Sequence, residues 1–314
     1  MRRMKRIIVL GLVAVMLAVT LCGCGFEVQQ AQVPPRQSGE SSVDDVRSPT
    51  VNYQRSDSEL SVHFLDVGQA DSILVILPDR RVMLVDGGNN ADGPVVVKYL
   101  ERTGIKRIHY LVGTHPHEDH IGGLDDVIEA FEVEKVYMPR VAHNTRTYED
   151  VLTAIKARNL KVTPARAGLI VLDDPGLQIE FLAPGSSDYK DLNQYSAVIK
   201  ITYINCSILL TGDAGFESEE EMIASGADLE ADVLKVGHHG SRYSTSEEFL
   251  EAVSPVYAVI SCGKDNDYGH PHEETISRLA GQAARILRTD RDGTVIITCD
   301  GQDLQVKTGQ SSGD

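Results

Sequence analysis

Short apolar runs alternate with amphipathic segments along most of the chain, and this alternation limits the possible folds more than any other feature. Residues 60–68 alternate apolar and polar side chains as a half-buried strand does, whereas residues 89–103 and 148–159 place apolar side chains at helical spacing. The second half repeats the pattern, and residues 285–298 predict a pair of strands joined through a turn. Strands and helices alternating in two similar halves predict a single α/β domain, a four-layer αββα sandwich, over residues 60–308.

The first 23 residues predict a secretion signal. The cationic stretch MRRMKR precedes an apolar run of signal-peptide length, which ends in LCGC. The small residues before Cys24 resemble the lipobox of bacterial lipoproteins, which implies that Cys24 is lipidated and begins the mature chain. We therefore expect an extracytoplasmic protein held at the cell membrane by a lipid anchor. The alternative is an uncleaved membrane anchor.

Residues 24–59 are rich in Ser, Gln, Pro and acidic side chains and have no sustained apolar period. Such a segment buries too little surface to offset its ordering entropy, so we expect a flexible tether there and a disordered tail at residues 309–314. The whole chain has a formal net charge of −16. A protein this acidic has no global field that attracts polyanions, which argues against a passive nucleic-acid binder but not against a metalloenzyme.

The cysteines outside the signal region do not predict a disulfide framework. Cys206, Cys262 and Cys299 are an odd number and lie in apolar stretches. We expect buried free thiols, with one disulfide pair as the alternative.

Three histidines and two carboxylates lie within six residues of the sequence THPHEDHIGG, residues 114–123. Imidazole and carboxylate groups are common protein ligands of zinc and similar cations. His115 and His117 point to one side if the backbone is extended, and a bend before Asp119 and His120 directs these two to a second point. One loop can therefore offer two ligands to each of two metal ions. The alternative, an exposed histidine-rich loop, fits poorly with the apolar strand before the motif and the Gly-Gly pair and helix after it.

Further candidate ligands end two other apolar runs. Asp213 follows ILLTG, and His238 and His239 follow DVLKVG. Strand ends in α/β folds converge on one edge, so Asp213 could bridge both metal ions and a histidine could complete the second site. Strand alternation sends His238 and His239 to opposite sides, and the sequence does not decide which of them is the ligand. For Asp213 taken alone, an ordinary turn aspartate is the alternative.

The motifs FLDVGQADS, LVDGG, THPHEDHIGG, LLTGD, DVLKVGHHGS and YGHP, in this order, resemble the metallo-β-lactamase superfamily over residues 60–300. Within it they are most similar to the branch of the ComEC competence proteins. The resemblance implies a metal-dependent hydrolase with two divalent metal ions, and catalytic roles for Asp119 and His239. The metal ligands that it implies are His115, His117, Asp119, His120, the bridging Asp213, and His238.

The chain also departs from the superfamily pattern. A third histidine often binds the first metal ion, but none occurs between His143 and Asp213. Asn193 and Ser196 lie in the matching region and are expected to line a more open, more weakly binding first site.

Several other polar residues are candidates for supporting roles. Asp66 and Asp86 resemble side chains that orient ligand imidazoles, with turn aspartates as the alternative. Ser241 and His270, from HHGS and YGHP, are expected near the substrate, although a rigid turn histidine is equally compatible with His270. Four cationic side chains near strand ends are candidates for phosphate contacts or simply solvated: Lys235, Arg242, Lys264 and Arg288.

Two bridged cations would make water a hydroxide nucleophile near neutral pH, which predicts attack on a phosphorus or carbonyl centre. The motif GHHGS lacks the G-x-S-x-G elbow of serine hydrolases, and Ser241 has no evident triad. The resemblance to ComEC favours a phosphodiesterase or nuclease acting on extracellular DNA, with Zn²⁺ or Mn²⁺ as the metal. The alternatives are a phosphodiesterase of cell-wall phosphorylcholine or teichoic acid, and a non-catalytic binding lipoprotein. The missing histidine argues against a β-lactam substrate, and no protein partner follows from the sequence.

Overall fold

The computed structural model describes residues 59–309 of the chain. The predictions for the signal peptide, for Cys24, for the tether before Glu59 and for the tail after Gly309 lie outside the described residues. None of the helices between residues 59 and 309 has the length and apolarity needed to cross a bilayer.

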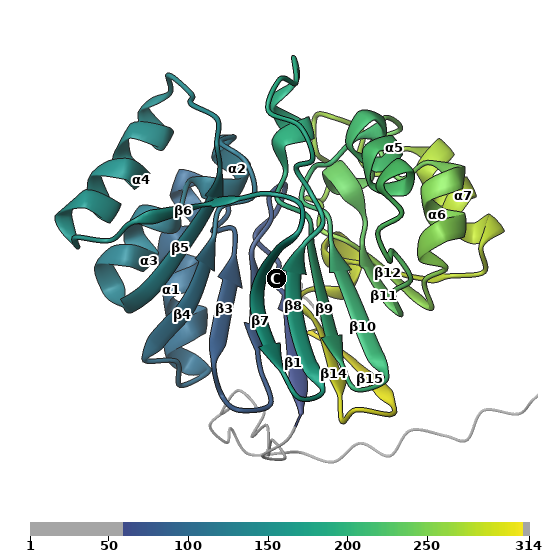
Figure 1. Ribbon diagram of the computed structural model, residues 1–314, viewed down its shortest axis with the longest axis horizontal. Helices are drawn as coiled ribbons and strands as arrows, with labels where there is room; N and C mark the ends of the chain where they lie inside the picture. The colour runs from purple at the N-terminus through teal and green to yellow at the C-terminus, as the bar shows by residue number, and fades with distance from the viewer. Residues whose placement is uncertain (1–58, 310–314) are drawn as a thin grey trace, which may run out of the picture. The chain divides into compact units, whose positions relative to one another are not determined.

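Two mixed sheets form the centre of the domain (Figure 1). The first sheet has the strand order β15-β14-β1-β2-β3-β4-β5-β6, and the second has the order β13-β12-β11-β10-β9-β8-β7. The first sheet contains β1 Leu60–Phe64, β2 Ile73–Ile76, β3 Val82–Val85, β4 Arg107–Val112, β5 Glu132–Pro139, β6 Val162–Ala165, β14 Val295–Cys299 and β15 Leu304–Thr308. The second contains β7 Leu169–Asp174, β8 Leu177–Phe181, β9 Ile199–Tyr203, β10 Cys206–Leu210, β11 Val233–Lys235, β12 Tyr257–Ile260 and β13 Arg285–Arg288.

Helices cover the outer faces of both sheets, with α1, α3 and α4 on one side of the molecule and α5, α6 and α7 on the other (Figure 1). The α-helices are α1 Gly93–Arg102, α2 Glu118–Ile121, α3 Leu124–Ala130, α4 Arg146–Ala157, α5 Phe216–Ser225, α6 Glu247–Val253, α7 Glu273–Gly281 and α8 Thr289–Asp292. Short 3-10 segments occur at η1 Asn90–Asp92, η2 Leu192–Tyr195 and η3 Gly237–Gly240.

Local sequence explains where these helices begin. Thr145 precedes α4 and its hydroxyl oxygen accepts a hydrogen bond from the backbone N–H of Tyr148, while Ser246 caps α6 in the same way. Both helices then bury one apolar stripe, which in α4 includes Val151 and Ile155. Capping and a single buried stripe are therefore sufficient to place these helices on the sheets.

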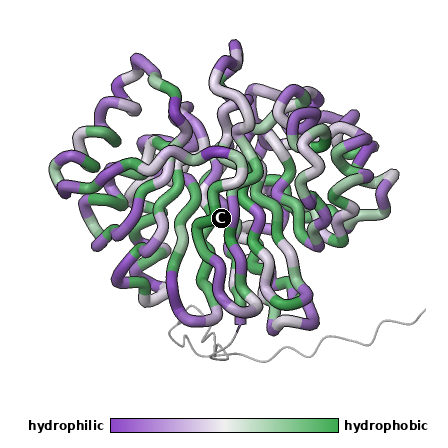
Figure 2. The backbone as a smooth tube through the Cα atoms, in the orientation of Figure 1, coloured by the Kyte–Doolittle hydropathy of each residue, from purple (hydrophilic) through white to green (hydrophobic). Residues whose placement is uncertain are grey.

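Three apolar layers confirm the predicted four-layer αββα sandwich. The central layer joins the inward faces of the two sheets and includes Phe64 and Phe181. One outer layer packs the first sheet against α1, α3 and α4, and the other packs the second sheet against α5, α6 and α7. Figure 2 shows the hydrophobic residues concentrated along the strands, with hydrophilic residues on the surrounding loops and outer helices.

Two sequence predictions about strands are wrong in detail. β1 is buried on both faces and not on one, because the polar side chain of His63 lies under α1, where its Nδ1 is 2.7 Å from the hydroxyl of Tyr99. Residues 285–298 do not form a strand pair, because β13 joins the second sheet and β14 the first, with α8 between them.

The expectation of three free thiols is also wrong. Cys206 on β10 and Cys299 on β14 form a disulfide, so a covalent bond links the two sheets, while Cys262 is a buried free thiol. Sequence spacing could not reveal this pair, because 93 residues separate its members and only sheet-on-sheet packing brings them together.

The parallel strands determine where functional loops can lie. In the first sheet β3, β4, β5 and β6 run parallel, and in the second β10, β11, β12 and β13 do. The loops that follow β4, β10, β11 and β12 leave the carboxyl ends of these strands. Open α/β sheets bind ligands at this edge.

Candidate metal centre

The histidine motif occupies the loop after β4 and the one-turn helix α2. His117 precedes α2, and Asp119 and His120 lie within it. The following Gly122 and Gly123 allow the chain to pass very close to the loop after β3: a Cβ atom on Gly122 would lie 2.2 Å from the backbone nitrogen of Asn90. The Gly-Gly pair therefore allows α2 to pack closely against the loop after β3, because a larger residue would collide with that backbone.

Asp86, at the end of β3, fixes the orientation of His120. The His120 Nδ1–H donates to Asp86 Oδ2 at 2.8 Å, and the Thr114 backbone N–H and hydroxyl donate to the two oxygens of the same carboxylate at 2.8 and 2.7 Å. This leaves His120 Nε2 facing Asp213, whose Oδ1 is 3.2 Å away. The structure thus places Asp86 beside a candidate ligand imidazole, as the sequence predicts.

His239 is oriented in the same manner from the second half of the chain. Its Nδ1–H donates to the carbonyl oxygen of Ser261 at 3.0 Å, so that its Nε2 faces Asp119 Oδ2 at 3.2 Å and Asp213 Oδ1 at 3.7 Å. His238 and His239 both have left-handed backbone conformations, with φ of 48° and 54°, in the turn η3. The two side chains do not alternate as on a strand, and both lie within 4 Å of Asp213.

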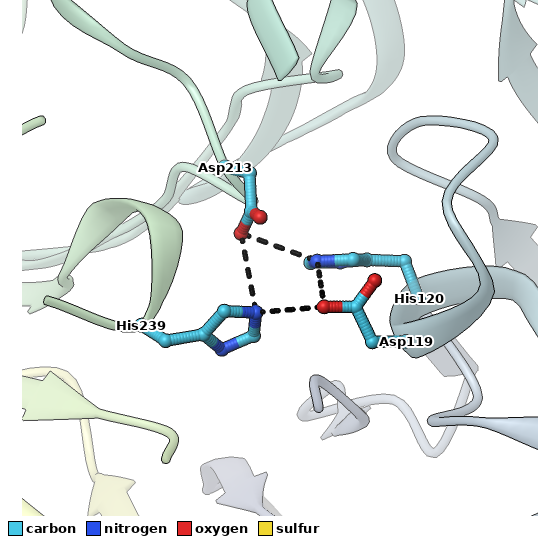
Figure 3. A group of neighbouring side chains, drawn as sticks. All are labelled: Asp119, His120, Asp213 and His239. Carbon is cyan, nitrogen blue, oxygen red and sulfur yellow. Dashed lines mark hydrogen bonds and ion pairs between the residues drawn. The ribbon is translucent and has the colours of Figure 1, made fainter. Parts of the chain in front are cut away.

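Asp119, His120, Asp213 and His239 form the group that we call the buried ligand cluster. One ligand atom from each lies within 4.8 Å of all the others. Figure 3 shows the four side chains converging, with Asp119 and His120 from the first half of the chain and Asp213 and His239 from the second. The cluster therefore forms only when both halves fold together.

The chemistry of the buried ligand cluster fits a divalent cation. Both imidazoles donate their Nδ1–H groups elsewhere, so each can present an Nε2 lone pair to the space that the two carboxylates also face. His120 Nε2 and Asp213 Oδ1 are buried and face each other across 3.2 Å without a well-aligned hydrogen bond. A cation bound by the four side chains would satisfy these groups.

His115 and His117 form a second, smaller set that we call the histidine pair. His115 Nε2 and His117 Nδ1 are 3.0 Å apart, and His115 Nε2 lies 3.9 Å from Asp213 Oδ2. Within residues 59–309, the pair belongs to no group of three candidate ligands that all lie within 4.8 Å of one another. Asp213 thus faces both sets, but only the buried ligand cluster is complete without further movement.

Electrostatics separates the two sets as well. Burial disfavours the charged form of His120, but the carboxylates of Asp213, Asp119 and Asp86 outweigh it and raise the pKa of His120 well above its ordinary value. Burial, together with the nearby His120, lowers the pKa of His115 well below its ordinary value. The buried ligand cluster thus favours positive charge, whereas the histidine pair favours neutral imidazoles.

A cavity of about 330 Å³ opens over the candidate ligands, and several predicted site residues line it. His238 is 30% exposed in its side chain and its Nε2 lies 3.7 Å from Asp213 Oδ2, on the opposite oxygen from His239. Asn193 Nδ2 lies 3.4 Å from His238 Nδ1. His270 also lines the cavity, with its ring centroid 5.5 Å from that of His238. The geometry favours exchanging the two predicted roles: His239 belongs to the ligand cluster and His238 to the cavity wall.

Ser196 and Ser241 are both buried, in different surroundings. Ser196 Oγ accepts a hydrogen bond from the backbone N–H of Asp213 at 3.0 Å and lies 3.4 Å from His115 Nδ1. Ser241 directly follows η3, its carbonyl oxygen accepts from the Thr275 hydroxyl at 2.8 Å, and it does not line the cavity. Ser196 therefore supports the site directly, while the predicted substrate contact of Ser241 is wrong.

The structure does not bring Asp66 to the site. Asp66 is exposed, its Oδ1 accepts from the Gly68 backbone N–H, and its own N–H donates to the Thr294 hydroxyl. The alternative interpretation, a turn aspartate, is the correct one for this residue.

A buried ion pair beneath the site was not predicted from the sequence. Lys235 is fully buried and its Nζ lies 2.8 Å from Asp71 Oδ2, so the suggested phosphate contact of Lys235 is wrong. Asp71 Oδ1 lies 3.6 Å from His239 Nδ1, and the Asp71 backbone N–H donates to the Asp119 carbonyl oxygen at 3.0 Å. The pair links both halves of the buried ligand cluster. The only sequence signal for this ion pair was that Asp71 and Lys235 lie within the motifs QADS and LKVGHH.

Comparisons with known proteins agree with this geometry. Residues 65–264 match the metallo-beta-lactamase superfamily. The chain is similar to ComE operon protein 3 of Bacillus subtilis, with 34% identity over 260 residues, covering 77% of this chain and 33% of that protein. It is also similar to competence protein ComA of Neisseria gonorrhoeae, with 31% identity and coverages of 76% and 32%, and to recombination protein 2 of Haemophilus influenzae, with 29% identity and coverages of 78% and 29%. The chain spans about a third of the length of these relatives.

Proposed function

The chain belongs to the metallo-beta-lactamase superfamily, and from this premise we propose that it is a metal-dependent phosphodiesterase that cleaves DNA. The observation that carries the proposal is the buried ligand cluster, in which four candidate ligands from both halves of the chain converge. The choice of DNA is supported by the similarity to proteins named for competence and for recombination, because both processes act on DNA.

Two sets of residues would hold the metal ions. The buried ligand cluster would hold one ion, and the histidine pair, with Asp213 between the two sets, would hold the other. Divalent cations bound there supply Lewis acidity and make water a better nucleophile near neutral pH. Zn²⁺ suits the imidazoles of both sets, and Mn²⁺ would suit the histidine pair if water molecules complete its coordination.

The protein's own groups position the reaction. Asp86 and the Ser261 carbonyl oxygen hold His120 and His239 so that their Nε2 atoms face the reaction space. A phosphodiester in the cavity would lie against the partly exposed His238, which donates a hydrogen bond to a phosphate oxygen. Water attacks phosphorus, the new P–O bond forms as the bond to the leaving oxygen breaks, and the proton that the attacking water loses passes to the leaving oxygen.

The test is a substrate panel with purified protein. DNA, bis-p-nitrophenyl phosphate, a phosphorylcholine ester and a cephalosporin are incubated with Mn²⁺ or Zn²⁺ and with chelator as the control. We expect cleavage of DNA and of the synthetic diester, and loss of both activities with chelator. Cleavage of the cephalosporin alone would overturn the proposal, and cleavage of the phosphorylcholine ester without DNA would move the substrate to the cell wall.

We also propose that the protein acts outside the cytoplasmic membrane through lipidation of Cys24. Metabolic labelling with a fatty acid tests this directly. We expect the wild-type chain to carry the label and to remain with membranes, and the Cys24→Ala variant to carry none. An unlabelled wild-type chain would contradict the anchor.

A further inference from the structure

The loop Gly263–His270, which follows β12, separates two cavities. One is the cavity over the candidate metal ligands, and Tyr268 and His270 form part of its wall. The other has a volume of about 420 Å³, and its wall includes Lys264, Arg288 and Arg291. His270 lines both cavities, so they adjoin at this side chain.

The loop is held in place by side-chain hydrogen bonds. Asn266 Nδ2 donates to the carbonyl oxygens of Gly263 and His270 at 2.9 and 2.6 Å, and its Oδ1 accepts from the His270 backbone N–H at 3.0 Å. Gln69, from the first half of the chain, accepts from the Gly263 N–H through its Oε1 at 3.0 Å. A loop fixed at both ends can present its side chains to a ligand without a large ordering cost.

Tyr268 presents an open aromatic face at the mouth of the metal cavity. Its ring stacks on that of His270, with centroids 5.6 Å apart and planes inclined by 24°, yet 68% of the residue is exposed. His270 is itself largely buried and so supports the tyrosine from behind. An exposed ring with a fixed backing is the kind of surface on which a nucleobase stacks.

The adjoining cavity has an excess of cationic side chains. Arg288 pairs with Asp290 through two contacts, Nε to Oδ1 at 2.9 Å and Nη2 to Oδ2 at 2.6 Å, so the charges of these two side chains balance and the excess comes from Lys264 and Arg291. Lys264 and Arg291 are exposed, and Asp265 is the other acidic side chain in the wall. The whole chain has a net charge of −16, so this local excess of positive charge is opposite in sign to the overall charge. It suits the binding of a phosphate group.

Resting on the proposed function, we propose that the loop Gly263–His270 binds a single nucleic-acid strand on both of its sides. Tyr268 stacks on the base next to the scissile phosphate, and the cavity of Lys264, Arg288 and Arg291 receives a neighbouring phosphate. A polymer that alternates flat rings with phosphates uses both features. A polyol-phosphate polymer, which has no flat ring, would use the cationic cavity only.

The first test measures the aromatic contact. A labelled oligonucleotide about 10 nucleotides long, with nuclease-resistant phosphorothioate linkages, is titrated with Mn²⁺-loaded protein by fluorescence anisotropy. We expect Tyr268→Ala to weaken binding about tenfold, and to change binding of the same strand made of abasic residues less than about twofold. Tyr268→Trp should bind both strands as the wild type does. Equal effects of Tyr268→Ala on both strands, or no effect on either, would overturn the stacking role.

The second test measures the phosphate contact. The double variant Lys264→Glu/Arg291→Glu should weaken binding of both strands about tenfold and flatten the dependence of log Kd on log salt concentration. The matched control is Lys106→Glu/Lys161→Glu, which makes the same charge change just before β4 and β6, at the amino ends of these strands. Two double variants that behave alike would overturn the cationic subsite.

Binding and hydrolysis separate this inference from the function on which it rests. If the wild type cleaves DNA but Tyr268→Ala and the double variant bind it normally, only the strand-binding role fails. If the variants behave as expected with the resistant strand while the wild type cleaves no phosphodiester, the proposed function fails and the strand-binding surface stands.

Discussion

The two ligand sets of the candidate metal centre differ in how complete they are. The buried ligand cluster combines two carboxylates with two imidazoles, and all four ligand atoms lie within 4.8 Å of one another. The histidine pair has two imidazoles 3.0 Å apart and reaches the Asp213 carboxylate only at 3.9 Å. The first set is a formed site for a cation, whereas the second needs water or substrate to complete its coordination.

The difference shows how one fold can hold two metal ions with unequal strength. Charge decides how strongly each set binds a metal ion. The carboxylates of the buried ligand cluster attract a cation, whereas the neutral histidine pair binds one only through its ring nitrogens and the shared Asp213. We expect the cluster to fill first and to remain filled. The histidine pair would then respond to metal concentration and to bound phosphate.

The largest expected effect comes from the residue that both sets share. Asp213→Ala should reduce phosphodiester hydrolysis by at least about 10⁴-fold, because it removes the carboxylate that faces both metal positions. The fold should survive, since the Asp213 backbone N–H that donates to Ser196 is retained. Turnover measured together with circular dichroism checks both statements. Asp173→Ala, an exposed aspartate on β7, is the matched control; full turnover by Asp213→Ala would exclude it as the bridging ligand.

Removing one ligand from each set should have unequal effects on catalysis and on metal content. His239→Ala should lower kcat by about 10³-fold and remove close to one equivalent of metal, because the buried ligand cluster loses a ligand oriented by Ser261. His117→Ala should cost about tenfold and be partly rescued by excess Mn²⁺, since the histidine pair is weak already. Metal content by mass spectrometry and kinetics at rising metal concentration measure both. The reverse order of effects would contradict the comparison.

How far the sequence predicts this site depends on distance along the chain. The loop 114–123 was predictable, because its ligands, its Gly-Gly pair and its flanking strand and helix are contiguous. The choice between His238 and His239 was not, because the left-handed turn η3 replaces the strand alternation on which that argument depends. The Asp71–Lys235 pair and the Cys206–Cys299 disulfide were also inaccessible, since contacts between the two halves of the chain create them.

A smaller effect is expected at the residue that orients His120. Asp86→Asn should weaken metal binding to the buried ligand cluster about 10- to 100-fold, because the amide is a poorer acceptor for the His120 Nδ1–H and no longer supports its basicity. His143→Ala, which removes a ring 6.1 Å from that of His117 in the histidine pair, should change cluster affinity less than about threefold. Calorimetric titration of the metal-free variants compares the two. Equal losses in both variants would mean that the two sets act as one unit.

The smallest effect, a proton count, tests the electrostatic difference. Because the pKa values of His120 and His239 are both raised in the metal-free protein, metal binding to the cluster must release between one and two protons at pH 7. The pKa values of His115 and His117 are lowered, mainly by burial, so binding to the pair should release none. Cluster affinity should therefore fall at least about tenfold when pH drops from 7 to 6, while pair affinity stays constant. Calorimetry in buffers of different ionisation enthalpy gives the count. Proton release from both sites alike would contradict the assignment.

Anomalous diffraction from crystals soaked in limiting Zn²⁺ tests the central claim most directly. The account predicts that the strongest peak lies within about 2.3 Å of ligand atoms from Asp119, His120, Asp213 and His239, with a weaker peak at His115 and His117. A strongest peak at the histidine pair, or none between the four side chains of the buried ligand cluster, would contradict it.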